Sequence, residues 1–401
     1  MTKASKGFSP RTEKLIYATA FFSLSSEILM GLALPLLAVE RGLSPDMLGA
    51  LLAAAAVGPV LFALPAGALC DHFGDKKVLL AMTTGISLTA LLYPFVGNLA
   101  GLFILQLLAG SFRSNSWVAI QSYMVRSAPP EALQAMAGKF SFSVNSGMLA
   151  APVLGGFFYT TWGATAAFCF IGFWGGCFAL LTFLLPASKA SLDTKPAWQI
   201  CLQSYRASLP VFLRPLLVIM LVITLARLMV GGIAFSFYPV YLDDIGLAAV
   251  TIGILLTLMN GSATLGSLAA NPLAKTIGLI QTLIGSLAIS VIAIAVLPMF
   301  QNLVAVAAVS VVHGLTFGIS MPLLLTGISQ NSEAHERGLI LGLRSVFNRA
   351  GVMSSALMLG FLVDGWGMLW GFLATGLIIL LLLLIISMAI YLTGRSQRAG
   401  A

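Results

Sequence analysis

The sequence predicts an all-α integral membrane protein with twelve transmembrane helices in two pseudo-symmetric six-helix halves. Composition carries the first part of this prediction, because 59% of the residues are hydrophobic and only 8% are charged, against about 25% charged residues in a soluble domain. Apolar runs of about 20 residues or more, enough to cross about 30 Å of hydrocarbon, recur along the chain. A repeat that runs through the whole chain carries the second part.

The repeat has a fixed offset of 204 residues. Glycines and prolines govern backbone geometry, so their coincidence at one offset indicates two copies of one fold. A duplicated apolar bundle is typical of secondary transporters. The coinciding pairs include Pro35 and Pro239, Gly42 and Gly246, Gly49 and Gly253, Gly110 and Gly314, Gly147 and Gly351, Gly156 and Gly360, and Gly163 and Gly367.

Charged and turn residues divide the chain into twelve predicted spans. We assign residues 1–186 to the N-terminal half, residues 187–212 to a cytoplasmic central loop and residues 213–401 to the C-terminal half. The predicted spans of the first half are 15–39, 47–70, 78–97, 100–124, 137–161 and 163–186. Those of the second half are 213–242, 250–272, 280–298, 303–328, 339–363 and 368–393.

The placement of the positive charges predicts the orientation in the membrane. The lysines and arginines of the predicted loops lie on the side of the termini, and Arg41 is the exception. By the positive-inside rule, both termini and the central loop are cytoplasmic. We therefore expect a multi-pass protein of the bacterial inner membrane. The net charge of +8 then reflects topology rather than nucleic-acid binding.

The sequence carries no pattern of an enzyme site. It has no metal-ligand cluster, no Ser/His/Asp set and no GxxxxGK[ST] phosphate loop, and its four cysteines form no CxxC pair. We expect no enzyme activity, no cofactor, no metal and no ATP-driven step within the chain. The expected partners are a small-molecule substrate, protons and the lipid bilayer, and we expect a monomer.

One dense charge cluster interrupts the apolar sequence between the second and third predicted spans. It reads Gly67-x-x-x-Asp71-x-x-Gly74-x-Lys76-Lys77 and resembles the signature loop of the major facilitator superfamily. The predicted twelve spans, the repeat and the long central loop extend the resemblance over nearly the whole chain. The resemblance implies the major facilitator fold, with Asp71 and its loop as a latch on the cytoplasmic gate.

The cluster departs from the family pattern in both halves. His72 and Asp75 stand where the family often has arginines. The second copy carries Asn271 and Lys275 in place of the glycine and the aspartate. We therefore expect a weaker or tunable latch that acts from the first half only.

Two arginines lie in the cytoplasmic part of the predicted span 339–363, namely Arg344 and Arg349. By analogy with the family, this end packs near the loop of Asp71, and the start of a helix attracts a carboxylate. We therefore assign both arginines to the gate. Anchoring by the positive-inside rule is the alternative, and it suits Arg344 better than the deeper Arg349.

Small residues in the predicted span 137–161 resemble the motif typical of the proton-driven exporters of this superfamily. Small residues at this spacing let another helix pack closely, and a proline bends the span. The motif favours export over import, with generic helix packing as the alternative. Its members are Gly138, Gly147, Ala151, Pro152, Gly155 and Gly156, with Ala151 where a third glycine is usual.

Four ionisable residues lie near the middle of predicted spans, where a charge costs at least about 2.5–3.5 kcal/mol. Resemblance to the superfamily places these spans around a central cavity. Their repeat partners are uncharged, so function explains them better than an inherited scaffold does. The four residues are Glu27, Arg113, Arg227 and His313.

Each of the four has a functional and a structural interpretation. Glu27 is the candidate proton carrier, because a carboxylate in a low-dielectric cavity can load and release a proton near neutral pH. The alternative is a static ion pair with Arg113. Arg113 and Arg227 are candidate substrate anchors, since guanidinium binds carboxylate or phosphate through two hydrogen bonds. His313 either relays protons or is simply hydrogen-bonded.

The cavity residues also predict the substrate. Two arginines against one glutamate favour an anionic, zwitterionic or neutral amphipathic molecule. Gln106, in the place of an arginine common in exporters, and the aromatic Trp117 and Tyr238 are further candidate contacts. The leading hypothesis is proton-coupled export by alternating access. A proton-coupled symporter of an organic anion is the alternative, followed by a membrane-embedded enzyme or a non-transporting sensor.

Overall fold

The computed structural model describes residues 9–62, 69–70, 72–129, 131–187, 199, 209–332 and 337–399. Every regular element within these ranges is helical, which confirms the predicted all-α class, and the number of twelve spans stays a prediction. The predicted central loop lies mostly outside the described residues, apart from a short 3₁₀ helix at its end.

The N-terminal half contains six α-helices and one 3₁₀ helix among the described residues. They are α1 (Pro10–Ser23), α2 (Ser25–Glu40), α3 (Pro45–Phe62), α5 (Asp75–Leu92), η1 (Tyr93–Phe95), α6 (Leu99–Ser127) and α7 (Leu133–Leu184).

The C-terminal half has long helices in the same order, together with two short 3₁₀ helices, among the described residues. They are η2 (Leu209–Leu213), α9 (Pro215–Asp244), α10 (Ala249–Ile277), α11 (Leu279–Val296), η3 (Leu297–Met299), α12 (Leu303–Gln330) and α13 (Arg337–Ala399).

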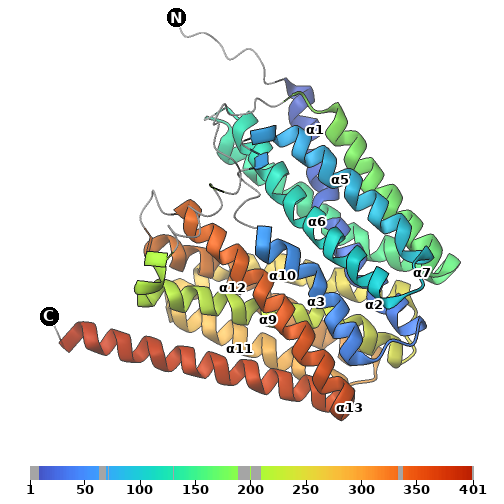
Figure 1. Ribbon diagram of the computed structural model, residues 1–401. Helices are drawn as coiled ribbons and strands as arrows, with labels where there is room; N and C mark the ends of the chain where they lie inside the picture. The colour runs from blue at the N-terminus through green and yellow to red at the C-terminus, as the bar shows by residue number, and fades with distance from the viewer. Residues whose placement is uncertain are drawn as a thin grey trace, which may run out of the picture.

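Eight helical stretches among the described residues are long and apolar enough to cross a membrane. Two of them, α7 and α13, have 52 and 63 residues and are each interrupted by one glycine with non-helical backbone angles. Figure 1 shows α13 folding back on itself. The breaks fall at Gly163 and Gly367, where the sequence analysis separates two predicted spans.

The repeat is visible in the backbone angles. All residues with positive φ among the described residues are glycines, and they form three pairs at the offset of 204. A positive φ favours glycine because a Cβ atom would clash with the backbone. The pairs are Gly42 (φ 70°) and Gly246 (φ 83°), Gly74 (φ 87°) and Gly278 (φ 105°), and Gly163 (φ 77°) and Gly367 (φ 78°).

Helix starts repeat in the same way. The side chain of Asn98 accepts a hydrogen bond of 2.6 Å from the amide of Gly101 at the start of α6. Asn302, its partner in the repeat, accepts one of 2.8 Å from the amide of Val304 at the start of α12. Each asparagine satisfies an amide that the first helical turn leaves unpaired.

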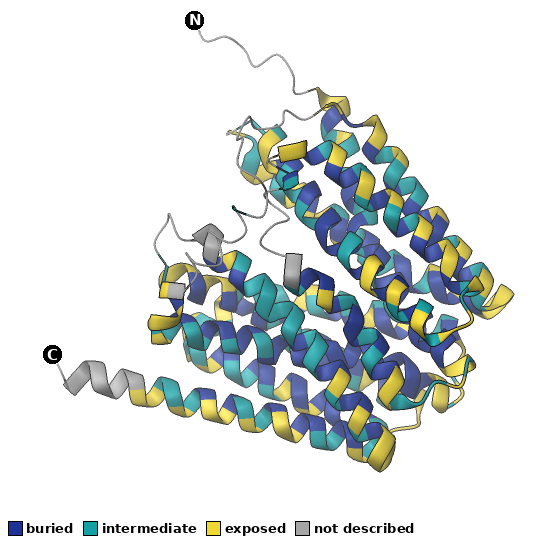
Figure 2. Ribbon diagram, viewed as in Figure 1, coloured by how far each residue is buried: buried dark blue, intermediate teal, exposed yellow. Residues whose placement is uncertain are grey.

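The two halves meet along two seams, α3 against α13 and α7 against α10. Figure 1 shows α3, in blue, lying beside α13, in orange. Figure 2 shows the buried residues on the helix faces that point into the bundle and many exposed ones on its outer faces.

Glycines bring the backbones into direct contact along both seams. A methyl group on Gly49 would clash with the carbonyl oxygen of Ala356, and one on Gly253 would clash with that of Pro152. The two contacts are related by the offset of 204. Gly49 and Gly253 lie in the first turns of α3 and α10, so the halves are joined near the turns at Gly42 and Gly246, opposite the predicted cytoplasmic side.

Candidate transport site

A break between α1 and α2 positions the acidic residue of the site. Serine hydroxyls next to the break donate to carbonyls of the preceding turn, from Ser25 to Phe21 (2.8 Å) and from Ser26 to Phe22 (3.0 Å). Such bonds bend helices. Trp174 of α7 fixes the bend by donating from its indole nitrogen to the hydroxyl of Ser25 at 2.9 Å. Glu27 consequently lies in the first turn of α2.

Glu27 forms an ion pair with the other half of the molecule. Nη1 of Arg349 on α13 lies 2.7 Å from Oε1 of Glu27. The Glu27 side chain is 40% exposed and that of Arg349 is 21% exposed, although both lie within long apolar helices. The pair therefore faces accessible space between the two halves.

Close packing of α13 on α9 sets the position of Arg349. A methyl group on Gly351 would lie 2.5 Å from the carbonyl oxygen of Leu225, and one on Gly232 would clash with the hydroxyl oxygen of Ser355. Glycine at both positions lets the two helices approach at the depth of Glu27.

Arg113 lies on α6 behind the ion pair. It is buried and within electrostatic reach of Glu27, Arg349 and Tyr93. The hydroxyl of Tyr93 donates to Oε1 of Gln106 at 2.6 Å. The candidate binding residue Gln106 is thus buried and already hydrogen-bonded, whereas Arg113 belongs to the same charged group as Glu27.

Arg227 lies on α9 in a separate group within the C-terminal half. Its Nε donates to the hydroxyl of Ser320 at 2.7 Å, and its guanidinium carbon lies 4.0 Å from the ring centre of Phe317. That contact is within the range of a cation–π interaction. Arg344 of α13 lies within electrostatic reach of Arg227 and contacts the sulfur of Met321 at 3.8 Å.

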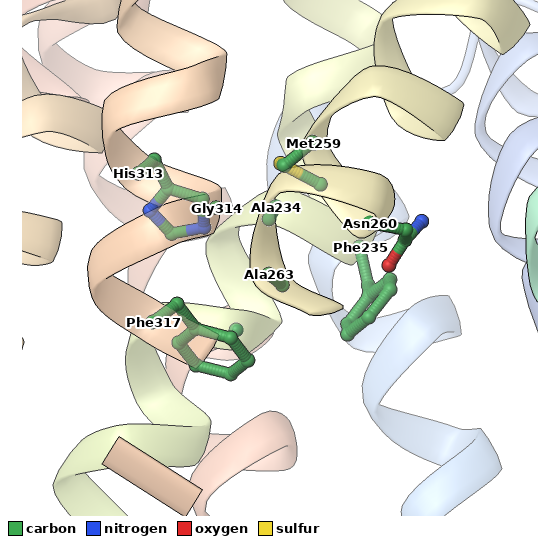
Figure 3. A pocket seen from close by; sticks show the side chains of 9 residues that line it. Ala234, Phe235, Met259, Asn260, Ala263, His313, Gly314 and Phe317 are labelled. Atoms are coloured by element: carbon green, nitrogen blue, oxygen red, sulfur yellow. The ribbon is translucent and has the colours of Figure 1, made fainter. Parts of the chain in front are cut away.

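His313 continues the same group along α12. It stacks on Phe317 with ring centres 5.7 Å apart, and its Nδ1 lies 3.0 Å from Oγ and 3.1 Å from the carbonyl oxygen of Ser290 on α11. Beside it lies a pocket of about 20 Å³ between α9, α10 and α12. Figure 3 shows His313 and Phe317 on one side of this pocket and Phe235 with Asn260 on the other.

The two predicted aromatic contacts do not join these groups. Tyr238 is fully buried, and its hydroxyl pairs with that of Ser310 at 2.7 Å inside the C-terminal half. Trp117 packs on Phe140 with ring centres 6.0 Å apart in the N-terminal core. Both serve helix packing in this structure.

The predicted latch is described only in part. Gly67 and Asp71 lie outside the described residues, so their role in the gate stays a prediction. Gly74 ends the loop and starts α5 with a positive φ, as Gly278 does for α11. This glycine geometry is therefore retained in the copy whose charges differ.

The rest of the loop contacts the N-terminal half. The carboxylate of Asp75 is fully buried, and its Oδ2 lies 3.7 Å from Nε of Arg126 on α6. Nζ of Lys76 lies 5.6 Å from the ring centre of Phe183 on α7, and Lys77 is exposed. These contacts connect the start of α5 to α6 and α7.

The small residues of α7 form contacts on both sides of this helix. A methyl group on Gly147 would clash with the carbonyl oxygen of Phe21, and one on Gly156 would clash with that of Ala249 on α10. Gly155 faces Leu29 of α2.

A methyl group on Gly138 would have no neighbour within 4 Å among the described residues. Ala151 and Pro152 are buried between these contacts.

Two arginines, Arg113 and Arg349, therefore lie near a single glutamate, and two more, Arg227 and Arg344, form a second group in the C-terminal half. The arginines would hold carboxylate or phosphate groups, and the glutamate would hold a proton or an ammonium group. Within the part of the chain that the structure describes, no cluster of three or more His, Cys, Asp or Glu residues is suited to a metal ion. The arginines are Arg113, Arg227, Arg344 and Arg349.

Arg113 is the partner of Glu27 in the ion pair considered from the sequence, whereas in the structure the partner is Arg349. One signal could have pointed there: Arg349 lies deeper in its span than positive-inside anchoring requires. The residue with which it pairs, however, depends on how the two halves of the fold are placed. Local sequence does not show this placement.

Comparison with known proteins places the chain in a family. The family model of the Major Facilitator Superfamily matches residues 15–248 and 219–400. The chain belongs to the major facilitator superfamily. It is a multi-pass membrane protein and a secondary transporter.

Similarity to individual members of the superfamily is modest. The uncharacterised transporter YceJ of Bacillus subtilis (strain 168) is 28% identical, over 94% of this chain and 95% of that protein. The gallate transporter of Pseudomonas putida is 36% identical over 96 residues, which are 24% of this chain and 21% of that protein. The crystal structure of the nucleoside transporter NupG matches with a TM-score of 0.80 at 12% identity, over 94% of this chain and 99% of that one. The last likeness concerns the fold alone.

Proposed function

We propose that this transporter is a proton-coupled exporter of small amphipathic molecules that carry a carboxylate, in the bacterial inner membrane with both termini cytoplasmic. The observation that carries the proposal is the ion pair between Glu27 of the N-terminal half and Arg349 of the C-terminal half. It is a titratable contact between two bodies that move relative to each other during alternating access.

Protonation of Glu27 would remove one charge of this pair. Arg349 then loses its counter-ion, and the attraction between the halves at this depth is lost. Because the pair faces accessible space, a proton can reach the carboxylate without opening the protein core. We assign the proton step to Glu27 alone, since its carboxylate pairs with the other half of the molecule, whereas His313 contacts residues of its own half.

Exchange of substrate for protons requires the two to compete. A zwitterion satisfies this requirement, because its ammonium group binds the ionised Glu27 while its carboxylate binds Arg113 or Arg349. A proton on Glu27 removes the ammonium site. The small-residue motif of α7, which resembles that of exporters, supports the same direction.

A second candidate is symport of an organic anion with protons, and one observation favours it. Protonation of Glu27 frees Arg349, so that an anion without an ammonium group binds better once the proton has bound. Proton and anion then travel together. The local similarity to a gallate transporter is in keeping with this candidate.

Transport in oriented vesicles separates the two candidates. We expect inside-out vesicles with an acidic interior to accumulate a zwitterionic substrate, and we expect Glu27→Gln to abolish this accumulation. Uptake of a plain carboxylate by right-side-out vesicles under an inward proton gradient would establish symport. Gradient-driven transport that persists in Glu27→Gln would contradict both.

A further inference from the structure

The pocket between α9, α10 and α12 takes no part in the proposed coupling, yet a buried polar atom faces it. His313 is 2% exposed, and its ring forms part of the pocket wall. Figure 3 shows that one ring nitrogen of His313 points toward the pocket. Nδ1 is bonded to Ser290 on α11, so the nitrogen on the pocket side is Nε2.

Ser290 decides which nitrogen carries the proton. Its carbonyl oxygen lies 3.1 Å from Nδ1 of His313. A carbonyl can only accept, so Nδ1 donates. The hydroxyl of Ser290 is free to donate to the carbonyl oxygen of His313, 3.4 Å away. In the neutral imidazole Nε2 is then an acceptor.

This acceptor has no hydrogen-bond partner among the described residues. An acceptor left without a donor beside apolar walls costs free energy that a bound donor recovers. Across the pocket, Nδ2 of Asn260 donates to the carbonyl oxygen of Leu256 at 2.9 Å, which leaves its Oδ1 as a second acceptor. Nε2 of His313 and Oδ1 of Asn260 therefore accept hydrogen bonds, and the amide of Asn260 keeps one N–H donor as well.

The size and walls of the pocket limit what can enter. Its volume of about 20 Å³ suits a group of the size of one water molecule. Phe235, Phe317 and Met259 supply apolar walls. The guanidinium of Arg227 on the ring of Phe317 disfavours a cationic group nearby. A neutral hydroxyl or N–H group meets all of these conditions.

We propose that this pocket is a specificity subsite that receives a neutral hydroxyl or N–H group of the transported molecule, with Nε2 of His313 as the acceptor. The transported molecule is then an organic acid or zwitterion. It also carries a hydroxyl or N–H group at an end that is flat or slender enough to enter the pocket. The body of the molecule stays at the mouth of the pocket, and Arg227 is available to its carboxylate. This inference rests on the proposed function, because it takes the ligand to be the transported molecule.

Binding of two matched probes to the purified full-length protein tests the subsite. Benzoate and 4-hydroxybenzoate share a carboxylate and a flat ring, and only the second has a hydroxyl donor. We expect calorimetry to show about tenfold tighter binding of 4-hydroxybenzoate, the worth of one hydrogen bond to a buried acceptor. In His313→Phe, which keeps a ring against Phe317, the ratio of the two affinities should fall to about one.

Two serine variants test the positioning role of Ser290. Ser290→Ala removes the hydroxyl 3.0 Å from Nδ1 and keeps the carbonyl that fixes the tautomer, so the ring is held less firmly, and we expect a preference between those of the wild type and His313→Phe. Ser286→Ala is the matched control, because Ser286 is a buried serine one turn earlier on α11 that donates to Leu283 of its own helix. It should keep the full preference.

Labelling of histidine with ¹⁵N gives a readout that needs no transport. The chain has three histidines, and His313→Phe identifies the signal of His313. We expect a protonated Nδ1 and an unprotonated Nε2, and a shift of Nε2 with 4-hydroxybenzoate but not with benzoate. A protonated Nε2, equal affinities in the wild type, a preserved preference in His313→Phe or binding of neither probe would overturn the subsite. None of these results depends on a proton gradient, so they are separate from a failure of the proposed coupling.

Discussion

Asn98 and Asn302 cap their helices in the same way in the two halves, whereas Glu27 of the N-terminal half corresponds to Gly231 of the C-terminal half. The devices that shape the backbone are duplicated, and the ionisable side chains in the middle of the helices are not. Both halves must fold alike, so caps and turn glycines are retained. Under the proposed function a single acidic residue is enough to bind the proton, and the N-terminal half supplies it.

A contact at the helix ends opposite the predicted cytoplasmic side, which we call the rim, is also repeated in both halves with different side chains. In the N-terminal half the guanidinium of Arg41 donates to the carbonyl oxygen of Val96 at 2.5 Å. In the C-terminal half the hydroxyl of Tyr241 donates to the carbonyl oxygen of Phe300, the repeat partner of Val96, at 2.6 Å. Both halves therefore keep a hydrogen-bond donor at this carbonyl oxygen, although the donor is a guanidinium in one half and a hydroxyl in the other.

The largest effect on transport is expected from a substitution that removes the charge of Glu27, which has no counterpart at Gly231 in the C-terminal half. Glu27→Gln removes the acid that the C-terminal half lacks and should abolish proton-driven transport, a loss at or beyond the upper end of the factor of about 5–150 that a coupling between two sites usually reaches. Transport under an imposed pH gradient measures it. Glu40→Gln is the matched control, since Glu40 is an exposed acid at the far end of α2 that accepts a hydrogen bond from Tyr159. A loss of equal size in Glu40→Gln would remove the special role of Glu27.

A smaller, symmetric effect is expected at the helix breaks. Gly163→Ala and Gly367→Ala each place a Cβ atom at a φ that favours glycine, so each should lower the free energy of unfolding by about 1–3 kcal/mol. Thermal unfolding in detergent measures this. Gly365→Ala, two residues from the break and with open space around the new methyl group, should be neutral or stabilising. Unequal losses at Gly163 and Gly367 would show that the two breaks differ in role.

The smallest effect is expected at the rim, from Tyr241→Phe, and there the halves should differ. Arg41 also donates to the carbonyl oxygens of Tyr93 and Pro94, each at 3.1 Å, so Arg41→Ala should cost about 1.5–3 kcal/mol of unfolding free energy. Tyr241→Phe removes one neutral hydrogen bond and should cost about 0.5–1.5 kcal/mol. Chemical unfolding of both variants measures which substitution lowers the free energy of unfolding more. A larger loss in Tyr241→Phe would mean that packing, rather than capping, governs this rim.

The sequence predicts the scaffold because its signals are local. Glycine at a positive φ and an apolar run of sufficient length can be read without knowing the neighbours. The breaks at Gly163 and Gly367 thus lie where the predicted spans are divided.

The candidate site is less predictable, because its contacts depend on how distant helices are rotated. Glu27 and Arg349 are 322 residues apart in the chain, and their pairing follows from the seams between the halves. Gln106 and Tyr238 are polar and sit on suitable helices, but each is already bonded to a neighbour on an adjacent helix. Sequence position could not show this.

The central claim is that protonation of Glu27 changes how the two halves are held together. Pulsed electron paramagnetic resonance between spin labels at Gln134 of α7 and Gln330 of α12, both exposed at the predicted cytoplasmic ends, measures it directly. We expect acidification to shift the distance distribution of the otherwise unmodified protein, and Glu27→Gln to show the acidic distribution at neutral and acidic pH alike. A distribution that responds to pH equally with and without Glu27, or does not respond at all, would contradict it.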